Sequence, residues 1–389
     1  MTSTTFSNVR IWNGISGEYS EYDSVSIADG KISALGERNA HSRTMDGLTI
    51  IPGLIDAHVH MTLDPKIPSL KEQLSQSDDE IRAKMRVRAQ EMVRSGITTA
   101  RDLGGGRWLE LELRDRINRG EVAGPRLLCA GQPLTSKNGH CYFWGGEATN
   151  KSEISEVVDR QHAHGVDLIK IMATGGMYTK NSQPGRAQFE QEEVSLAVEI
   201  ANRLGYSVAA HCHGTEGIAH AAFAGVATIE HCSWLDTQGS RAGCDKDISR
   251  EIARRGIWVS PTINAGWARF MGGDGRFEAH IKKLFKDMKE CGVKFIASTD
   301  AGIPNVLHHE LSRALQVFAS LAGLSPVESL LSATTHAANA LGIKESTGTI
   351  EVGKDADLLF LEGDPLQDLA ALQQPVLVVA RGREYSTRS

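Results

Sequence analysis

Six side chains that can hold metal ions are spread along the chain, each in or directly after a short apolar run. They are His58, His60, Lys170, His211, His231 and Asp300. Imidazole and carboxylate groups are ligands that zinc accepts in mixed sites of this kind. Two divalent ions that share a hydroxide make it a good nucleophile near neutral pH. The set therefore predicts the dispersed site of a binuclear metal-dependent hydrolase, with zinc as the best-fitting ion.

Two His-x-His pairs differ in their local context. His58 and His60 close an apolar run typical of a β-strand, where the period of two places both imidazoles on the same face. His162 and His164 close a run with helical spacing, where residues two apart lie about 200° apart around the axis. We therefore expect the first pair to bind one ion and the second pair to lie on a helix surface.

A third pair, His211 and His213, ends another expected strand. Both imidazoles should face the interior of the fold, with Cys212 between them facing outward. The spacing predicts at least one metal ligand at this position, and it leaves the choice between the two histidines open.

Lys170 is the most informative residue of the six. Strand periodicity places Leu168, Lys170 and Met172 on one face, which directs the ammonium group into an interior where an unpaired charge is costly. One interpretation is a salt bridge with a nearby acid. The other is that burial lowers the pKa of the amine until it reacts with carbon dioxide. The resulting carbamate would bridge two metal ions as a carboxylate does.

The elements that must position these residues alternate in type. Apolar segments typical of strands are separated by segments with the i, i+3, i+4 apolar spacing of helices. The eight expected strands span residues 50–61, 97–103, 126–131, 167–174, 207–213, 228–234, 257–262 and 294–299. Eight βα units predict an α/β fold, a closed (β/α)8 TIM barrel whose active site lies at the carboxyl ends of the strands.

The two ends of the chain have a different pattern. Short apolar runs separated by glycine-containing turns occupy residues 6–50, and similar runs return in residues 348–380. We expect residues 1–50 and 346–389 to form one small composite β-sandwich domain. Residues 51–345 would then form the barrel.

Composition limits the classes of partner and compartment. The chain has 389 residues, 41% of them hydrophobic, and 42 basic against 48 acidic side chains give a net charge of −6. This balance predicts neither a nucleic-acid nor a membrane partner. The N-terminal residues lack the pattern of a signal peptide, and no apolar run reaches the ~18 residues of a membrane span, so we expect a cytoplasmic protein. Six scattered cysteines are typical of reduced thiols.

The chain resembles the amidohydrolase superfamily in the order of its motifs. The resemblance rests on Ile51-Pro-Gly-Leu-Ile-Asp-Ala-His-Val-His60, Lys170, His211, His231 and Ser298-Thr-Asp-Ala-Gly302. Further motifs resemble the branch of imidazolonepropionase-related amidohydrolases and metal-dependent Xaa-Pro and Xaa-Arg dipeptidases, namely Gly139-His140 and residues 169–176, 210–214 and 334–338. The resemblance implies a small-molecule substrate, and because relatives commonly assemble, it also implies a homo-oligomer.

The resemblance divides the six ligands between two ions. The more buried ion is implied to be held by His58, His60 and Asp300, and the more exposed ion by His211 and His231. Carboxylated Lys170 would bridge both. Of the two histidines on the fifth strand, His211 aligns better with the family ligand, which leaves His213 to contact either the substrate or a metal ligand.

Four residues are expected to act on the substrate or the attacking water. Asp300 would accept the proton of the attacking hydroxide and pass it to the leaving nitrogen. His140, in a loop rich in glycine and aromatic residues, would reach the substrate carbonyl or carboxylate. Tyr178 and Arg186 are candidates for binding a substrate carboxylate, and the alternative for Arg186 is an exposed side chain without a role.

The favoured function is hydrolysis of a C–N amide bond, in a dipeptide or an N-acyl amino acid, by attack of a metal-bridging hydroxide. An alternative is hydrolysis or deamination of a cyclic amide or imidazolone-type compound, although one-metal enzymes of that kind generally lack a residue like Lys170. A weaker alternative is a non-catalytic barrel that acts as a binding protein. Trp144, Trp234 and Trp267 would either form an aromatic wall of the pocket or pack beneath the loops.

Three other polar residues, Arg101, Asp102 and His336, are expected to have no role in the chemistry. Arg101 and Asp102 are adjacent, which predicts a local ion pair. His336 lies in residues 326–341, where the apolar spacing predicts one amphipathic helix, so we expect this histidine to pack rather than to bind metal.

Overall fold

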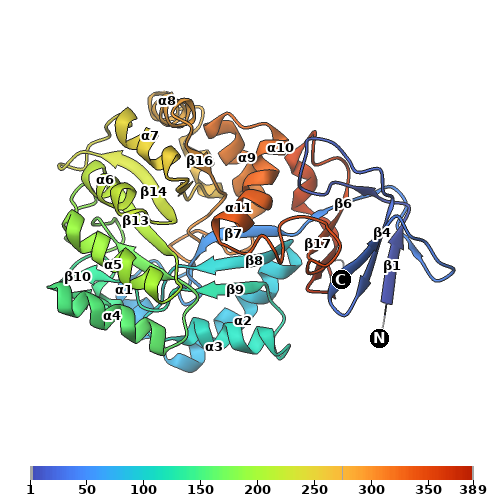
Figure 1. Cartoon of the computed structure of the whole chain (residues 1–389), viewed down its shortest axis with the longest axis horizontal. Helices are drawn as coiled ribbons and strands as arrows, with labels where there is room; N and C mark the ends of the chain where they lie inside the picture. The colour runs from blue at the N-terminus through green and yellow to red at the C-terminus, as the bar shows by residue number, and fades with distance from the viewer. Residues whose placement is uncertain (1–2, 274, 388–389) are drawn as a thin grey trace.

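The computed structural model describes residues 3–273 and 275–387, which form a barrel and two smaller terminal sheets (Figure 1). Strands fill the centre of the barrel and helices lie around them. The first and last strands of the chain gather at one end of the molecule, on the right in Figure 1. No helix among the described residues has both the length and the apolar character needed to cross a membrane.

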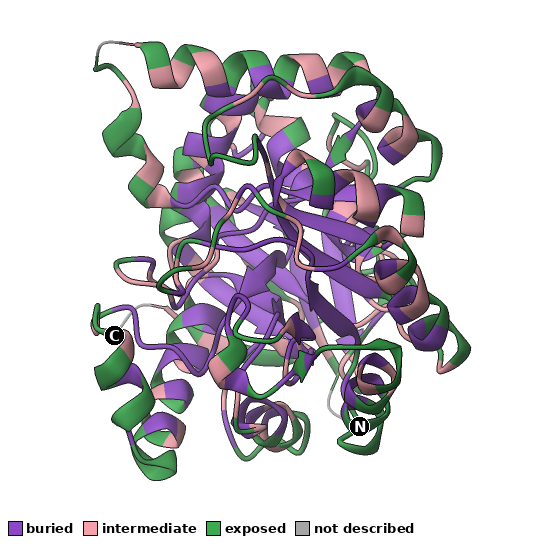
Figure 2. Ribbon diagram, turned by 90° about the vertical axis from the view of Figure 1, so that its left-hand side faces the viewer, coloured by how far each residue is buried: buried purple, intermediate pink, exposed green. Residues whose placement is uncertain are grey.

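The barrel strands form two parallel sheets, in the orders β7-β8-β9 and β12-β13-β14-β15-β16. Their bounds are β7 (Leu54–Val59), β8 (Ile97–Asp102), β9 (Arg126–Cys129), β12 (Ile169–Met172), β13 (Val208–Gly214), β14 (Thr228–Leu235), β15 (Trp258–Ser260) and β16 (Lys294–Phe295). Almost all of their residues are buried (Figure 2). That burial fits the near-continuous apolar runs of a parallel sheet covered by helices.

Backbone hydrogen bonds close the two sheets into one barrel. Leu134, in the segment after β9, donates to the Lys170 carbonyl at 2.8 Å and accepts from the Met172 amide at 2.8 Å. On the other side, the Asp300 amide donates to the carbonyl of His58 at 2.9 Å. These bonds join β9 to β12 and the end of β16 to β7, so the expected α/β TIM barrel is confirmed.

The helices alternate with the barrel strands and turn their apolar faces toward them. They are α1 (Leu70–Ser75), α2 (Asp78–Arg94), α3 (Leu109–Asn118), α4 (Lys151–Ala163), α5 (Gln191–Arg203), α6 (Thr215–Ala224), α7 (Lys246–Arg254), α8 (Arg276–Glu290), α9 (Leu311–Ala322), α10 (Pro326–Ser332) and α11 (Thr335–Ala340). The loops carry the short strands β10 (Thr135–Ser136) and β11 (Glu147–Ala148), and three 3-10 helices, η1 (Tyr142–Trp144), η2 (Ala265–Phe270) and η3 (Leu369–Gln373).

Strands from both ends of the chain build the two terminal sheets. One sheet contains β2 (Arg10–Ile11), β6 (Leu48–Pro52), β17 (Leu358–Glu362), β18 (Pro375–Ala380) and β19 (Arg383–Ser386), and the other contains β1 (Ser3–Ser7), β3 (Ser24–Ala28), β4 (Lys31–Leu35) and β5 (Arg43–Thr44). Their apolar faces share one buried core, in which the rings of Phe6 and Phe360 lie 4.8 Å apart. The domain boundaries at residues 50 and 346 stay a prediction.

Two expected elements are divided in the structure. The run 50–61 is not one strand, because the chain passes from β6 in a terminal sheet to β7 in the barrel at Gly53. A Cβ atom at Gly53 would lie 2.1 Å from Thr98 Oγ1, so only glycine allows this close approach. The expected helix over 326–341 is α10 followed by α11, because the backbone of Thr334 leaves the helical conformation.

Candidate metal centre

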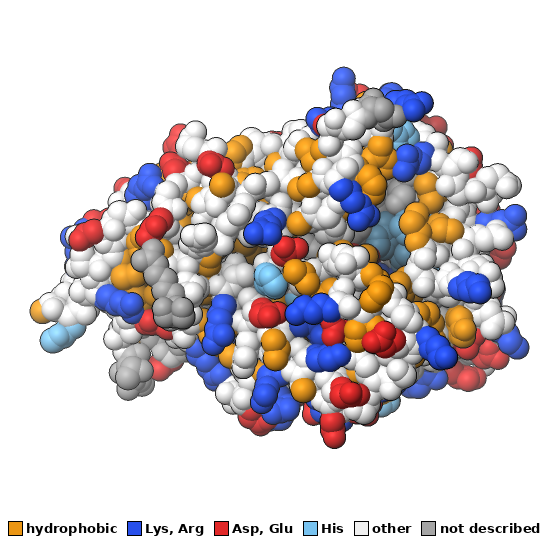
Figure 3. Space-filling view, turned by 180° about the vertical axis from the view of Figure 1, so that it is seen from behind, with side chains coloured by type: hydrophobic (Ala, Val, Ile, Leu, Met, Phe, Trp, Pro, Cys, Tyr) orange, Lys and Arg blue, Asp and Glu red, His pale blue; other side chains and the backbone are white. Residues whose placement is uncertain are grey.

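One cavity of about 490 Å³ brings all six expected metal ligands together. Its volume lies within the ~300–1,000 Å³ typical of small-molecule sites. His58, Lys170, His211 and His231 lie within barrel strands, whereas His60 and Asp300 lie in the residues that follow β7 and β16. Seen from behind the view of Figure 1, the surface has a hollow with histidine side chains inside it and hydrophobic side chains around it (Figure 3).

The first ligand group consists of His58, His60 and Asp300. Asp300 Oδ1 lies 3.3 Å from Nε2 of His58 and 3.3 Å from Nε2 of His60, and the two Nε2 atoms are 3.3 Å apart. The other ring nitrogen of each histidine forms a hydrogen bond, His58 Nδ1 with Glu230 at 2.9 Å and His60 Nδ1 with the Gly104 carbonyl at 2.9 Å. Hydrogen bonds of this kind set the ring orientation of metal-binding histidines. The three free ligand atoms therefore converge as one metal site requires.

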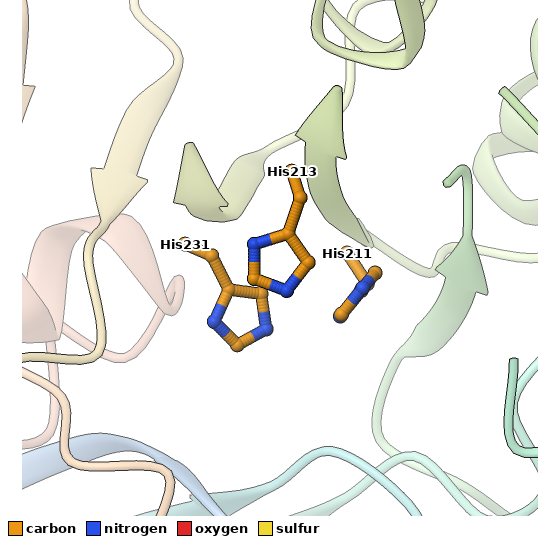
Figure 4. A group of neighbouring side chains, drawn as sticks. All are labelled: His211, His213 and His231. Carbon is orange, nitrogen blue, oxygen red and sulfur yellow. The ribbon is translucent and has the colours of Figure 1, made fainter. Parts of the chain in front are cut away.

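The second group consists of His211, His213 and His231, whose rings turn toward one another (Figure 4). The ring centroids of His211 and His231 are 4.5 Å apart, and those of His213 and His231 are also 4.5 Å apart. Each ring has one nitrogen in a hydrogen bond: His211 with the Gly175 carbonyl at 3.0 Å, His213 with Ser233 at 2.8 Å and His231 with Thr262 at 2.8 Å. The choice between His211 and His213 as the ligand stays open.

The backbone at two of the ligands adopts the left-handed conformation that non-glycine residues rarely use. The φ angle is 66° at His231 and 61° at Asp300. At β14 this breaks the period of two, so the adjacent residues Glu230 and His231 both face the interior. Such backbone conformations cost about 1–3 kcal/mol each and recur at functional sites.

Lys170 lies between these groups in sequence and lines the same cavity, with 1% of its surface exposed. No ion pair links its amine to a carboxylate in the described part of the chain, so the salt-bridge interpretation has no partner there. The two carboxylates whose charges act on this amine have other partners, Glu230 with Arg101 and His58, and Asp300 with the first histidine pair. Burial is the main cause that lowers the pKa of Lys170 to about 8. The neutral amine, the form that reacts with carbon dioxide, is therefore more abundant near neutral pH than it is for an exposed lysine.

Glu230 supports the first group and was not anticipated from the sequence. Its side chain is fully buried, and its Oε1 accepts from Arg101 Nη2 at 2.8 Å while its Oε2 is bonded to His58. Arg101 also donates to the Ala57 carbonyl at 2.7 Å. The expected local pair of Arg101 with Asp102 is therefore wrong. Adjacent side chains of a strand point to opposite faces of the sheet. The Asp102 carboxylate accepts hydrogen bonds from two backbone amides instead.

Glu230→Gln is expected to lower the free energy of unfolding by about 3–5 kcal/mol, because the buried Arg101 guanidinium loses its counter-charge. Metal affinity should also fall about 10–100-fold, since the amide holds His58 less firmly. Chemical unfolding and metal titration measure the two effects. The matched control is Glu112→Gln, which breaks the exposed Arg82–Glu112 pair and should cost under about 1 kcal/mol. Equal unfolding free energies for the two variants would contradict this role of Glu230.

His140 lies against the second ligand group, with its ring 4.5 Å from that of His211. The ring is buried, and its Nδ1 has no hydrogen-bond partner among the described residues. Burial, together with the charges of nearby His213 and Lys170, lowers the pKa of His140 to about 3, so the imidazole is neutral. Gly176 makes room for it, because a Cβ there would lie 2.4 Å from the ring.

The structure brings one of the two expected carboxylate-binding residues to the cavity. Tyr178 lines it, and its hydroxyl is buried without a partner among the described atoms. Arg186 is exposed and does not line the cavity. Of the three tryptophans considered for an aromatic wall, Trp144 and Trp267 line the cavity, whereas Trp234 is fully buried in the core.

Comparisons with known proteins agree with this architecture. Residues 49–384 match the amidohydrolase family. Ochratoxinase from Aspergillus niger is 28% identical over 364 residues, which cover 85% of this chain and 73% of the relative. Imidazolonepropionase from Mesorhizobium japonicum is 25% identical over 362 residues, covering 85% and 82%. A solved Xaa-Pro dipeptidase with bound methionine superposes with a TM-score of 0.87 at 28% identity, covering 99% of this chain and 100% of that chain. The chain therefore belongs to the amidohydrolase family and is a hydrolase of C–N bonds.

Proposed function

We propose that the protein is a binuclear metal-dependent hydrolase that cleaves the amide bond of a dipeptide or an N-acyl amino acid. One observation carries the proposal: two groups of three ligand atoms and the unpaired amine of Lys170 line the same cavity. The Xaa-Pro dipeptidase and ochratoxinase likenesses support an amide substrate.

The residues fit two divalent ions. In the proposal, His58, His60 and Asp300 would hold one ion and His211 and His231 the other, and a carbamate formed from carbon dioxide on Lys170 would serve as a ligand for both. Nitrogen and oxygen donors of this kind favour zinc. When bound, the pair of ions would lower the pKa of a shared water and polarise the scissile carbonyl.

Asp300 is the proposed proton carrier. Burial alone would raise the pKa of its carboxyl group, but the neighbouring His58 and His60 outweigh that effect and hold the pKa well below its usual range. The side chain is therefore a carboxylate at neutral pH and can accept a proton from the attacking water. It would then give this proton to the leaving nitrogen as the carbon–nitrogen bond breaks and the acyl carbon keeps the oxygen of water.

Three further residues are proposed to contact the substrate. The neutral ring of His140 can donate one N–H to the oxygen that becomes negative during attack. Tyr178 lines the cavity and offers its unpaired hydroxyl to a polar group of the substrate. His213 is proposed as a substrate contact because His211 is taken as the ligand. Arg186 is not retained, because its side chain does not reach the cavity.

The imidazolonepropionase relative supports the alternative substrate, a cyclic amide or imidazolone-type compound. One-metal enzymes that act on such compounds generally lack a residue like Lys170, so Lys170 argues against a one-metal version of this alternative. The cytoplasmic location and the homo-oligomeric state stay predictions.

Protein purified without chelator is expected to contain about two equivalents of divalent metal per chain, with zinc predominant. Removal of the ions by a chelator should abolish hydrolysis of N-acyl amino acids or dipeptides, and zinc with bicarbonate should restore it. Elemental analysis and a substrate screen measure these outcomes. A metal content below ~0.2 equivalents, with no activity after zinc and bicarbonate, would rule out the binuclear hydrolase.

A further inference from the structure

The cavity extends from the metal ligands along the inner face of α8. Four apolar side chains of this helix line it, at the spacing i, i+3, i+4 and i+7: Ile281, Leu284, Phe285 and Met288. All four are buried and pack in the main core, so they form a rigid floor. This part of the cavity carries no metal ligand and favours an apolar group.

Three aromatic rings also line the cavity, and we call them the aromatic cluster: Trp267, Phe270 and Phe277. The ring centroids of Phe270 and Phe277 are 4.9 Å apart, and that of Trp267 lies 5.8 Å from Phe277. None of the three residues is fully buried. Trp267 and Phe277 are half-buried, and Phe270 exposes 40% of its surface. The cluster therefore offers ring surface that a ligand can cover.

Two arginines rest on the aromatic cluster. The guanidinium carbon of Arg241 lies 4.1 Å from the centroid of Phe277, and that of Arg269 lies 4.6 Å from the centroid of Phe270. Both side chains line the cavity, and neither forms an ion pair with a carboxylate in residues 3–273 and 275–387. Burial and the charge of Arg241 lower the pKa of the neighbouring His280, so this ring adds no competing charge of its own at neutral pH. The two guanidinium groups remain available for an anion.

The aromatic cluster is attached directly to the metal centre. His231 is bonded to Thr262 at 2.8 Å, and η2, which carries Trp267 and Phe270, begins three residues later at Ala265. The cavity is continuous from the ligands to the cluster. A substrate whose amide bond lies at the ions can therefore place one of its halves over the cluster.

We propose that this half is an aromatic amino acid with a free carboxylate, released as the leaving group. Its ring would pack between the aromatic cluster and the apolar floor, and its carboxylate would bind Arg241 and Arg269. An aromatic group alone would leave two cations unneutralised, and a carboxylate alone would leave the apolar floor exposed to water. An aromatic amino acid satisfies both. The inference rests on the proposed function, because it names the class of amide that the enzyme cleaves.

Substrate preference follows directly. With the acyl group held constant, N-acetyl-L-phenylalanine and N-acetyl-L-tryptophan should exceed N-acetyl-L-alanine in kcat/KM by about tenfold or more, because the ring covers apolar surface that a methyl group leaves open. N-acetyl-L-phenylalanine amide should be a substrate about tenfold poorer than the free acid. Steady-state kinetics of the zinc-loaded enzyme measure both ratios.

Variants separate the ring from the charge. Phe277→Ala should reduce the phenylalanine-to-alanine ratio about tenfold, whereas Phe223→Ala, an exposed phenylalanine on α6 outside the cavity, should leave the ratio unchanged. The double variant Arg241→Gln, Arg269→Gln should remove the preference for the acid over the amide. If Tyr178→Phe removes that preference and the double arginine variant does not, the carboxylate binds on the opposite wall and the proposal is wrong.

Binding of L-phenylalanine and L-alanine to the zinc-loaded enzyme, measured by calorimetry, distinguishes this inference from the proposed function. Phenylalanine should bind about tenfold more tightly, and the double arginine variant should weaken it. If N-acyl amino acids are hydrolysed but alanine and phenylalanine bind equally, the subsite is refuted and the amide hydrolase stands. If no amide is cleaved but phenylalanine binds as expected, the subsite stands and the proposed function fails.

Discussion

Lys170→Ala is expected to lower kcat/KM by a factor on the order of 10³ or more, because the two ions lose the ligand that bridges them. Alanine has no amine that carbon dioxide can modify, so metal content should fall from about two equivalents to one or fewer. The folded structure should survive, since the Lys170 amine forms no ion pair within the described chain. Elemental analysis, steady-state kinetics and thermal unfolding measure the three effects.

A small carboxylate can test the chemical reason for this loss. Formate or acetate added to Lys170→Ala should occupy the space of the carbamate and restore part of the activity. Lys180→Ala is the matched control, because Lys180 is an exposed lysine in the loop that follows the same strand. That variant should keep full activity and both ions. Unaltered kinetics in Lys170→Ala would show that no carbamate bridge is needed.

Asp300→Asn is expected to lower kcat by about 10²–10⁴-fold, the range that general acid–base catalysis contributes. An amide has nearly the shape of the carboxylate and keeps one oxygen toward the ions, but it cannot accept a proton from water. The backbone bond from the Asp300 amide to the His58 carbonyl is unaffected by the change, so the fold should be retained.

Metal content separates two explanations for a loss of turnover in Asp300→Asn. Substantial retention of both ions with low kcat supports proton transfer by Asp300. Loss of the ions would show that the substitution lowers turnover only because it weakens metal binding. Unchanged turnover would remove Asp300 from the proton-transfer role altogether.

The barrel could be predicted from the sequence because strand and helix periodicities are local. Leu168, Lys170 and Met172 share a face by the period of two, and the structure places Lys170 and Met172 in the cavity lining. The same argument separated His162 and His164, which lie at the end of α4 and bind Tyr206 and Trp108 respectively. The apolar pattern of residues 50–61 did not reveal that the chain changes from a terminal sheet to the barrel at Gly53.

The support of the metal centre could not be predicted, because it depends on contacts between distant strands. His58 and Glu230 are 172 positions apart, and the left-handed backbone at His231 is what lets both Glu230 and His231 face inward. Sequence adjacency wrongly paired Arg101 with Asp102 for the same reason. Similarly, the arginines that line the cavity are Arg241, which lies in a loop, and Arg269, which lies in η2, and no strand periodicity orients either side chain.

The binuclear site bridged by Lys170 is tested most directly by crystals of the protein purified without chelator. Anomalous diffraction recorded above and below the zinc absorption edge would locate each ion. We predict two anomalous peaks, one at His58, His60 and Asp300 and one at the histidines of β13 and β14, with density for a carboxyl group on the Lys170 amine between them. A single peak, or an unmodified Lys170 beside two peaks, would contradict the account.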